Sequence, residues 1–181
     1  MTNESAFIEL RRATPADRDL LAQAGRACFV ETFGHLYRPE DLAAFLGTAH
    51  APEAWQRTLA DPALATWIAV GAAGCAAGYA VAGPCKLPAA GREPLAGELR
   101  QLYLRAGYQR RGLGTRLLET ALAWLEAAGH EPLYIGVWSE NFGAQRLYAR
   151  YGFQPVGEYL FPVGQHRDRE FILKRQPVYQ Q

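Results

Sequence analysis

One short stretch constrains the fold more than any other, the run Gln-Arg-Arg-Gly-Leu-Gly-Thr-Arg at residues 109–116. It lies between an apolar run with strand character at 98–104 and a helix-like run at 117–128. Gly112 and Gly114 let the backbone turn tightly and come close to a ligand. Amides at the start of the following helix favour an anion such as phosphate. Positive charge is supplied nearby by Arg110, Arg111 and Arg116. The first hypothesis is therefore a phosphate-bearing cofactor.

Two common phosphate-binding loops are excluded by single residues. A Walker loop requires Lys directly after its last glycine, and this chain has Thr115 there. A dinucleotide fingerprint requires a third glycine at the position of Leu117. What remains is a Q-x-x-G-x-G pattern that follows a strand and begins a helix.

Bulk composition indicates an ordinary globular protein. The 181 residues fit one domain, and 49% are hydrophobic while 20% are charged. A net charge of +1 gives no support for a nucleic-acid partner or an acidic membrane surface. The three cysteines, Cys28, Cys75 and Cys85, form no C-x-x-C pair, so we expect free thiols in a reducing cytosol.

Neither a signal peptide nor a membrane span is expected. Residues 1–7 are polar and acidic and lack a basic region before an apolar core. The stretch between Asp61 and Lys86 carries no charge, but it is mostly Ala and Gly. A turn at 71–74 divides it, which predicts two strands rather than a membrane helix. These features predict a cytoplasmic protein.

Hydrophobic periodicity and capping signals predict the remaining elements. Thr14 and Pro15 indicate a helix start, and Gly129 and Gly152 indicate helix ends. The predicted strands cover 7–12, 64–70, 75–83, 98–105, 133–138, 153–161 and 166–174. The predicted helices cover 15–31, 38–46, 52–60, 112–128 and 142–151. This order predicts one mixed α/β domain over residues 7–175, followed by a polar tail at 176–181.

The loop resembles the acyl-CoA loop of the GNAT superfamily of N-acetyltransferases. A second block supports the resemblance, with Asn141, Ala144, Leu147 and Tyr148 followed by Tyr-Gly-Phe at 151–153. The resemblance implies a mostly antiparallel sheet of about seven strands flanked by helices. It also implies that the fourth and fifth strands splay apart, and a β-bulge could produce such splaying.

The resemblance further implies acetyl-CoA as the acetyl donor. The cofactor's pyrophosphate would bind the loop, and its pantetheine arm would pair with the preceding strand. Asn141 could cap its helix, contact the cofactor, or do both. The residues implied to bind the cofactor are Leu102, Tyr103, Leu104, Gln109, Arg110, Arg111, Gly112, Leu113, Gly114, Thr115 and Asn141.

Acetyl transfer needs a proton acceptor for the amine, a donor for the oxyanion and a proton for the leaving thiolate. Tyr148 is the candidate acid, because a phenol and a thiol have pKa values near about 10 and 8.5. Glu98 is the candidate base or water-holder, unless it faces solvent. A backbone N–H near Leu102 or Tyr103 is the oxyanion donor that the family implies. Asp168 could attract a cationic amine or could pair with a neighbouring arginine.

The acceptor is predicted less sharply than the donor. Residues 98–104 and 161–168 are similar to the spermidine/spermine acetyltransferase branch, which implies a small amine or polyamine. Alternatives are a protein N-terminus or lysine as acceptor, or a non-catalytic acetyl-CoA sensor. Aromatic residues in the N-terminal helices could line an acceptor pocket or form core, and they include Phe29, Phe33, Tyr37, Phe45 and Trp55. No metal is predicted, because His35, His50, His130 and His166 lack ligand spacing. Formation of a homodimer stays open.

Overall fold

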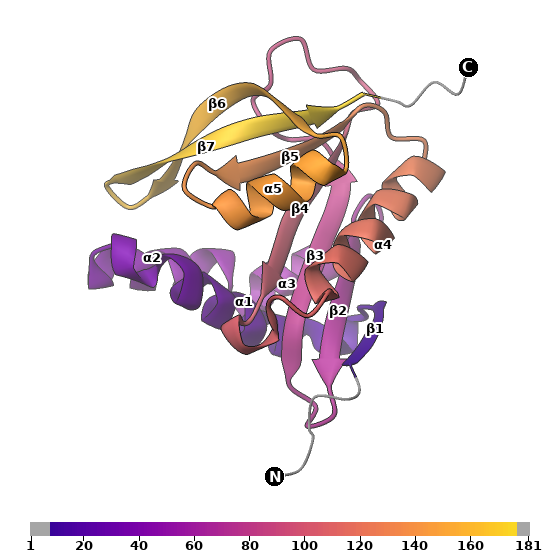
Figure 1. Cartoon of the computed structure of the whole chain (residues 1–181). Coiled ribbons are helices and arrows are strands. Elements are labelled where there is room, and N and C mark those ends of the chain that lie inside the picture. Colours follow the sequence, from indigo (N-terminus) through magenta and orange to yellow (C-terminus); the bar gives the residue numbers. More distant parts are fainter. Residues whose placement is uncertain (1–7, 177–181) are drawn as a thin grey trace.

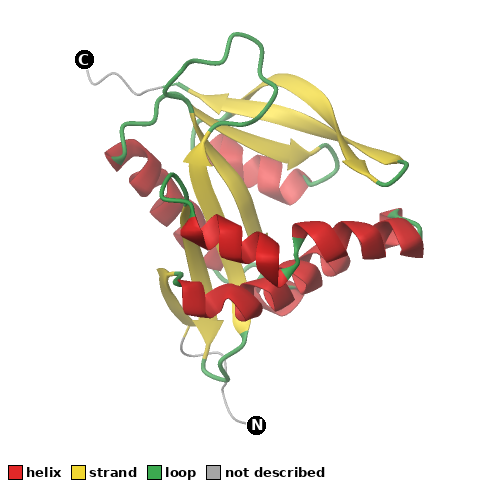
Figure 2. Ribbon diagram, turned by 180° about the vertical axis from the view of Figure 1, so that it is seen from behind, coloured by secondary structure: helices red, strands yellow, loops and turns green. Residues whose placement is uncertain are grey.

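A seven-stranded mixed sheet forms the centre of the molecule, in the spatial order β1-β2-β3-β4-β5-β7-β6. The computed structural model describes residues 8–176, and both figures of the whole chain show the sheet between two layers of helices (Figures 1 and 2). The strands are β1 (Ile8–Arg12), β2 (Ala65–Gly71), β3 (Ala76–Pro84), β4 (Gly97–Leu104), β5 (Leu133–Trp138), β6 (Gln154–Val163) and β7 (His166–Arg175). Neighbours are antiparallel except for β4 and β5, which run parallel. The predicted fold is confirmed.

Helices cover both faces of the sheet. One face packs against α4 (Leu113–Ala127) and α5 (Phe142–Arg150), through a core that includes the fully buried Leu117 and Leu118. The opposite face packs against α1 (Arg18–Phe33) and α3 (Pro52–Ala60), while α2 (Pro39–Ala49) lies toward the β6–β7 hairpin. Short 3-10 turns occupy Pro15–Asp17, Gly34–Leu36 and Ala106–Tyr108.

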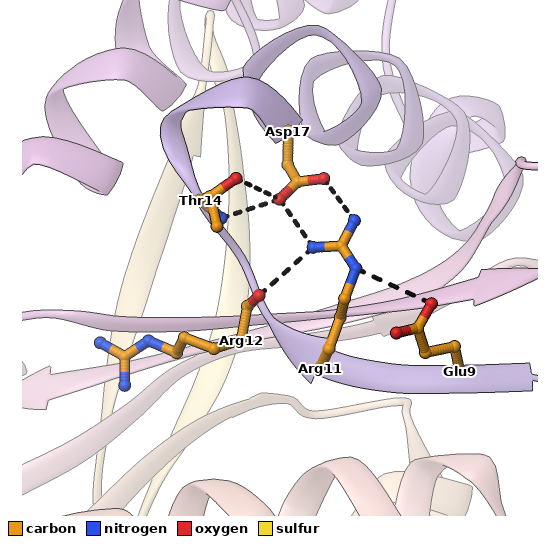
Figure 3. Close-up of polar contacts among 5 residues, drawn as sticks. All are labelled: Glu9, Arg11, Arg12, Thr14 and Asp17. Carbon is orange, nitrogen blue, oxygen red and sulfur yellow. Dashed lines mark hydrogen bonds and ion pairs between the residues drawn. The ribbon is translucent and has the colours of Figure 1, made fainter.

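A compact polar cluster connects β1 to α1 (Figure 3). Both Asp17 carboxylate oxygens accept hydrogen bonds from the Arg11 guanidinium, at 2.7 and 2.8 Å. The Thr14 N–H donates to the same carboxylate at 2.7 Å. These bonds, led by that of Arg11, lower the pKa of the buried Asp17 to about 2. The predicted helix at 15–31 therefore begins as a 3-10 turn with its first acidic residue held in place.

A β-bulge in β4 separates it from β5. Leu99 pairs with Ala82 and Gln101 pairs with Val81, so Arg100 is the extra residue of the bulge. Pairing between β4 and β5 covers three residues and ends where Leu99 faces Ile135. Beyond that point the two strands diverge, as Figure 1 shows. The sheet is thus splayed at the two strands expected from the resemblance, and the bulge supplies the local cause.

Most predicted boundaries agree within a few residues. The structure places α2 as far as Ala49 and α1 as far as Phe33, and both extend beyond their predicted ends. The segment between Asp61 and Lys86 forms β2 and β3 joined by a turn, as predicted. Within residues 8–176 no helix has the length and apolarity that a membrane crossing requires. Phe7 and residues 177–181 lie outside the described residues, so the predicted tail is described only at Gln176.

Candidate active site

Two hollows meet where β4 and β5 splay apart. One is a groove of about 780 Å³ beside the start of α4 and α5. The other is a cavity of about 260 Å³ that reaches toward α1, α2 and the β6–β7 hairpin. Six residues line both: Leu102, Tyr103, Trp138, Asn141, Ala144 and Tyr148. Ligands in the two hollows would therefore meet at these side chains.

The loop before α4 presents unpaired backbone donors to the groove. Gly112 adopts a left-handed φ of +76° at the helix N-cap, and Arg110 also has a positive φ of +59°. The first α4 hydrogen bond joins the Arg116 N–H to the Gly112 carbonyl, at 3.1 Å. The N–H groups of the three residues between them thus have no intrahelical acceptor. Because the helix dipole also favours negative charge here, the loop fits a phosphate group.

The charged side chains of the groove come from four separate segments. Arg110 and Arg150 line it, and so do two carboxylates, Glu31 from α1 and Glu140 from the turn before α5. Glu31 is held by the Arg105 Nε at 2.7 Å and by the Ala106 N–H at 2.8 Å. Arg150 was not predicted, although it follows Tyr148 by two residues and could have been found from that spacing. The groove therefore pairs backbone donors with two guanidinium groups, as a pyrophosphate requires.

Not every residue of the predicted loop faces the groove. Gln109, Arg110, Gly112, Gly114 and Thr115 line it. The Leu113 side chain is buried in the core, so this residue offers the groove only its backbone. Arg111 is exposed and is not among the lining residues.

Arg116 was expected to add charge at the phosphate loop, and this expectation is wrong. It lines a different hollow, beside Arg11, Arg12 and Trp67 of β1 and β2. Arg116 directly follows the groove-lining Thr115, but successive residues of a helix point about 100° apart, so its side chain leaves the helix on a different side.

Tyr148 stands between the groove and the cavity. It lies on α5, is 6% exposed, and packs near Phe153. Burial raises the pKa of its hydroxyl, so the phenol is protonated at neutral pH. Asn141 begins the same helix, and its Oδ1 accepts the Ala144 N–H at 3.1 Å. This bond confirms the predicted capping role of Asn141, while its side chain also lines both hollows.

The splay leaves one edge of β4 beside the groove. Leu102, Tyr103 and Leu104 pair with β3 only, and all three line the groove. In such a strand alternate residues direct their N–H and C=O groups away from the paired neighbour. The leucines pack toward the α4 layer and Tyr103 toward the α1 layer, as strand alternation predicts. An extended amide-bearing chain could add to this edge.

Three carboxylates line the smaller cavity: Glu98, Asp168 and Glu170. Glu98 is 7% exposed, so the solvent-facing alternative is wrong. Its Oε2 accepts the Lys86 N–H at 2.7 Å, and burial raises its pKa. Asp168 is 6% exposed and accepts a short hydrogen bond from the Tyr37 hydroxyl. Neither Arg167 nor Arg169 pairs with it, so the predicted arginine partner is also wrong.

Aromatic rings form much of the remaining cavity wall. The ring-bearing residues are Phe29, Phe33, Tyr37, Phe45, Tyr103, Trp138, Tyr148, Tyr159 and Phe161. Trp55 instead belongs to the core beneath α1 and α3. His50 also lines the cavity, and burial lowers its pKa to about 4, so the imidazole is neutral at pH 7. Arg100 is the single cationic side chain among the described lining residues. The cavity is therefore lined by more acidic than basic side chains, and with its aromatic faces it suits an organic cation.

Several cavity residues were beyond sequence reasoning. Tyr159 and Glu170 lie in the final hairpin, where no motif marks them. His50 lacks metal-ligand spacing, and no other sequence signal marks it as a cavity residue. Within residues 8–176 no group of three or more His, Cys, Asp and Glu side chains could hold a metal ion.

Comparisons with known proteins agree with this geometry. A model of the acetyltransferase (GNAT) family matches residues 26–153. The chain is 32% identical to an uncharacterized N-acetyltransferase encoded in the pepI 3′ region of Lactobacillus delbrueckii subsp. lactis, over 93% of this chain and 96% of that protein. Among solved structures, the PaiA N-acetyltransferase of Thermoplasma acidophilum in complex with coenzyme A superposes with a TM-score of 0.74. The identity is 18%, over 94% of this chain and 99% of that one. The ribosomal-protein-S18-alanine N-acetyltransferase of Escherichia coli gives a TM-score of 0.68 at 16% identity, over 97% of each chain.

Proposed function

The chain belongs to the acetyltransferase (GNAT) family, and on this premise we propose that it moves an acetyl group from acetyl-CoA directly to the primary amine of a small cationic acceptor. Membership makes the chain an acetyl-CoA-dependent N-acetyltransferase. The acceptor and the role of each residue are the proposal. We assign the activity to one domain over residues 7–175. The observation that carries the proposal is the meeting of groove and cavity at Tyr148.

The groove is the proposed donor side. The backbone N–H groups of Leu113, Gly114 and Thr115 would hold the pyrophosphate, with charge added by Arg110 and Arg150. Gln109, Arg111 and Gly112 complete the loop. The open edge at Leu102, Tyr103 and Leu104 would pair with the pantetheine amides, and Asn141 would contact the same arm. Bound acetyl-CoA supplies a thioester whose acyl carbon accepts the amine.

Tyr148 is the proposed general acid. Its phenol is buried, protonated and located at the junction of both hollows. It would donate its proton to the departing thiolate. Burial also raises the pKa of a thiol beside Tyr148, so the pKa values of the phenol and the thiol stay close to each other. A backbone N–H near Leu102 or Tyr103 would stabilise the oxyanion.

The cavity is the proposed acceptor side. Its three carboxylates outnumber the single guanidinium of Arg100, and its aromatic faces attract cations. Glu98 would draw in the ammonium group and hold a water molecule beside it. The cavity wall combines α1, α2 and the β6–β7 hairpin, which favours a small molecule over a folded protein surface. A polyamine is the specific candidate, taken from the similarity to the spermidine/spermine branch.

A thiol-release assay with a panel of amines tests this function. The panel contains spermidine, spermine, monoamines, amino acids and peptides with free N-termini or lysines. We expect coenzyme A release with the small cationic amines, with kcat/KM highest for polyamines. Turnover only with peptides would instead support a protein acetyltransferase. Binding of acetyl-CoA without turnover of any amine would support the non-catalytic sensor.

A further inference from the structure

The three carboxylates of the acceptor cavity differ in how fully their oxygens are engaged. Glu98 is tied to the loop before β4 by the Lys86 N–H and by further hydrogen bonds from the Leu87 backbone and the Cys85 side chain. Asp168 uses both oxygens, since Oδ2 accepts from the Tyr37 hydroxyl and Oδ1 lies 3.0 Å from the His166 Nε2. Glu170 has one partner within the described part of the chain, the Tyr159 hydroxyl, which donates to Oε2 at 2.6 Å. Glu170 therefore keeps one oxygen available to a ligand.

The fold brings this carboxylate to the splayed part of the sheet. On β7, Glu170 pairs with Trp138, a residue that lines both the groove and the cavity. A Cβ added to Gly136 of β5 would lie 3.3 Å from Glu170 Oε2 and 3.2 Å from the Tyr159 hydroxyl. The absence of a side chain at Gly136 thus leaves space for the carboxylate beside β5. This position is beyond Ile135, where the pairing of β4 with β5 has ended.

The surroundings of Glu170 favour its protonated form. Burial is the largest cause of its raised pKa, and the charges of Asp168 and Glu98 raise it further. The hydrogen bond from Tyr159 acts in the opposite direction. Tyr103 from β4 and Tyr37 from the α1–α2 connection also feel the Glu170 charge. A carboxylate in this setting is better suited to take up a proton than an exposed one.

We propose that Glu170 is the group that removes the proton from the acceptor's ammonium. This inference rests on the function proposed above. The free carboxylate oxygen takes one proton from R–NH3⁺, which leaves neutral R–NH2 and a protonated Glu170. The amine nitrogen then forms its bond to the acetyl carbon, the carbon–sulfur bond breaks, and Tyr148 protonates the sulfur. Glu98 keeps its separate role of attracting the ammonium and holding water.

The test compares the Glu170→Gln variant with wild type over a range of pH. Wild-type kcat/KM for the amine should rise with pH as the Glu170 carboxyl loses its proton. This rise is the acid limb of the pH profile. In the variant this acid limb should disappear, and kcat/KM near pH 7 should fall by about 10²- to 10³-fold. Its remaining activity should rise toward the pKa of the free amine, near about 10 for an alkyl ammonium. Acetyl-CoA affinity should stay unchanged.

Three further variants make the result specific. Tyr159→Phe removes a hydrogen bond that lowers the pKa of Glu170, so it should move the acid limb to higher pH. This shift tests the proposal even where Glu170→Gln does not fold. Glu98→Gln should raise KM for the amine and keep the acid limb. Glu158→Gln changes an exposed carboxylate of the same hairpin and should match wild type.

An unchanged acid limb in both Glu170→Gln and Tyr159→Phe would overturn the proposal. Loss of the limb in Glu98→Gln, with Glu170→Gln retaining it, would assign the proton transfer to Glu98 instead. Failure of the wild-type protein to acetylate any small amine would count against the proposed function itself. The two failures are therefore distinguishable.

Discussion

At the scale of single residues, the site depends on side chains whose surroundings change their chemistry. Tyr148 and Glu170 are ordinary residue types, but burial raises the pKa of each. Tyr148 is thereby kept as a proton donor, and Glu170 becomes a proton acceptor closer to neutral pH. Opposite roles follow from the same desolvation, because the charged form of each group is disfavoured.

The Tyr148→Phe substitution should lower turnover far more than cofactor binding. It removes only the hydroxyl, so the packing near Phe153 is preserved. A general acid contributes roughly 10²- to 10⁴-fold, and we expect kcat to fall by about 10²-fold. The measurement is steady-state thiol release together with acetyl-CoA titration by calorimetry. Equal turnover in the variant would remove Tyr148 from the mechanism.

Sequence reasoning could single out individual residues only where a motif marked the position. Asn141 and Tyr148 belong to a spaced block, and the structure places both at the junction of the two hollows. Glu170 belongs to no such sequence motif. It reaches the cavity only because β7 lies against β5, which is a tertiary contact that local spacing does not encode.

At the scale of elements, the loop at 109–116 and the bulge at Arg100 shape the two proposed ligand sites. The loop was predictable because glycines, arginines and a helix start occur together at 109–116. The bulge at Arg100 was not predictable, since one extra residue in a strand leaves no mark on its hydrophobic pattern. Both features present backbone groups to the groove, where we propose that the cofactor binds.

The Gly112→Ala substitution tests the loop. Its φ of +76° suits glycine, and an L-residue there costs about 1–2 kcal/mol. Because the loop must shift to relieve this strain, acetyl-CoA affinity should fall by about tenfold, measured by calorimetric titration.

Gly107→Ala is the matched control. Gly107 lies in the 3-10 turn at 106–108, has no left-handed φ, and has nothing within 4 Å of an added Cβ. The Gly107→Ala variant should bind acetyl-CoA with the same affinity as wild type. Equal affinities in both variants would contradict the proposed role of the loop.

At the scale of the whole molecule, the acceptor cavity is built from segments that are far apart in the sequence. Phe29 and Tyr37 come from the N-terminal helical region, Glu98 from β4, and Glu170 from the final hairpin. The element order and fold class were predictable from periodicity and capping signals. The set of residues that lines the cavity was not predictable, because it depends on how the β6–β7 hairpin packs against α2 across the splayed sheet.

A crystal structure with coenzyme A and an unreactive amine analogue tests the central claim most directly. We expect the pyrophosphate to contact the N–H groups at 113–115 and the pantetheine to follow the open edge of β4. The proposed mechanism also requires the sulfur within about 3.5 Å of the Tyr148 hydroxyl and the amine nitrogen in the cavity beside Glu170. A sulfur atom remote from Tyr148, or an amine bound outside the cavity, would contradict it.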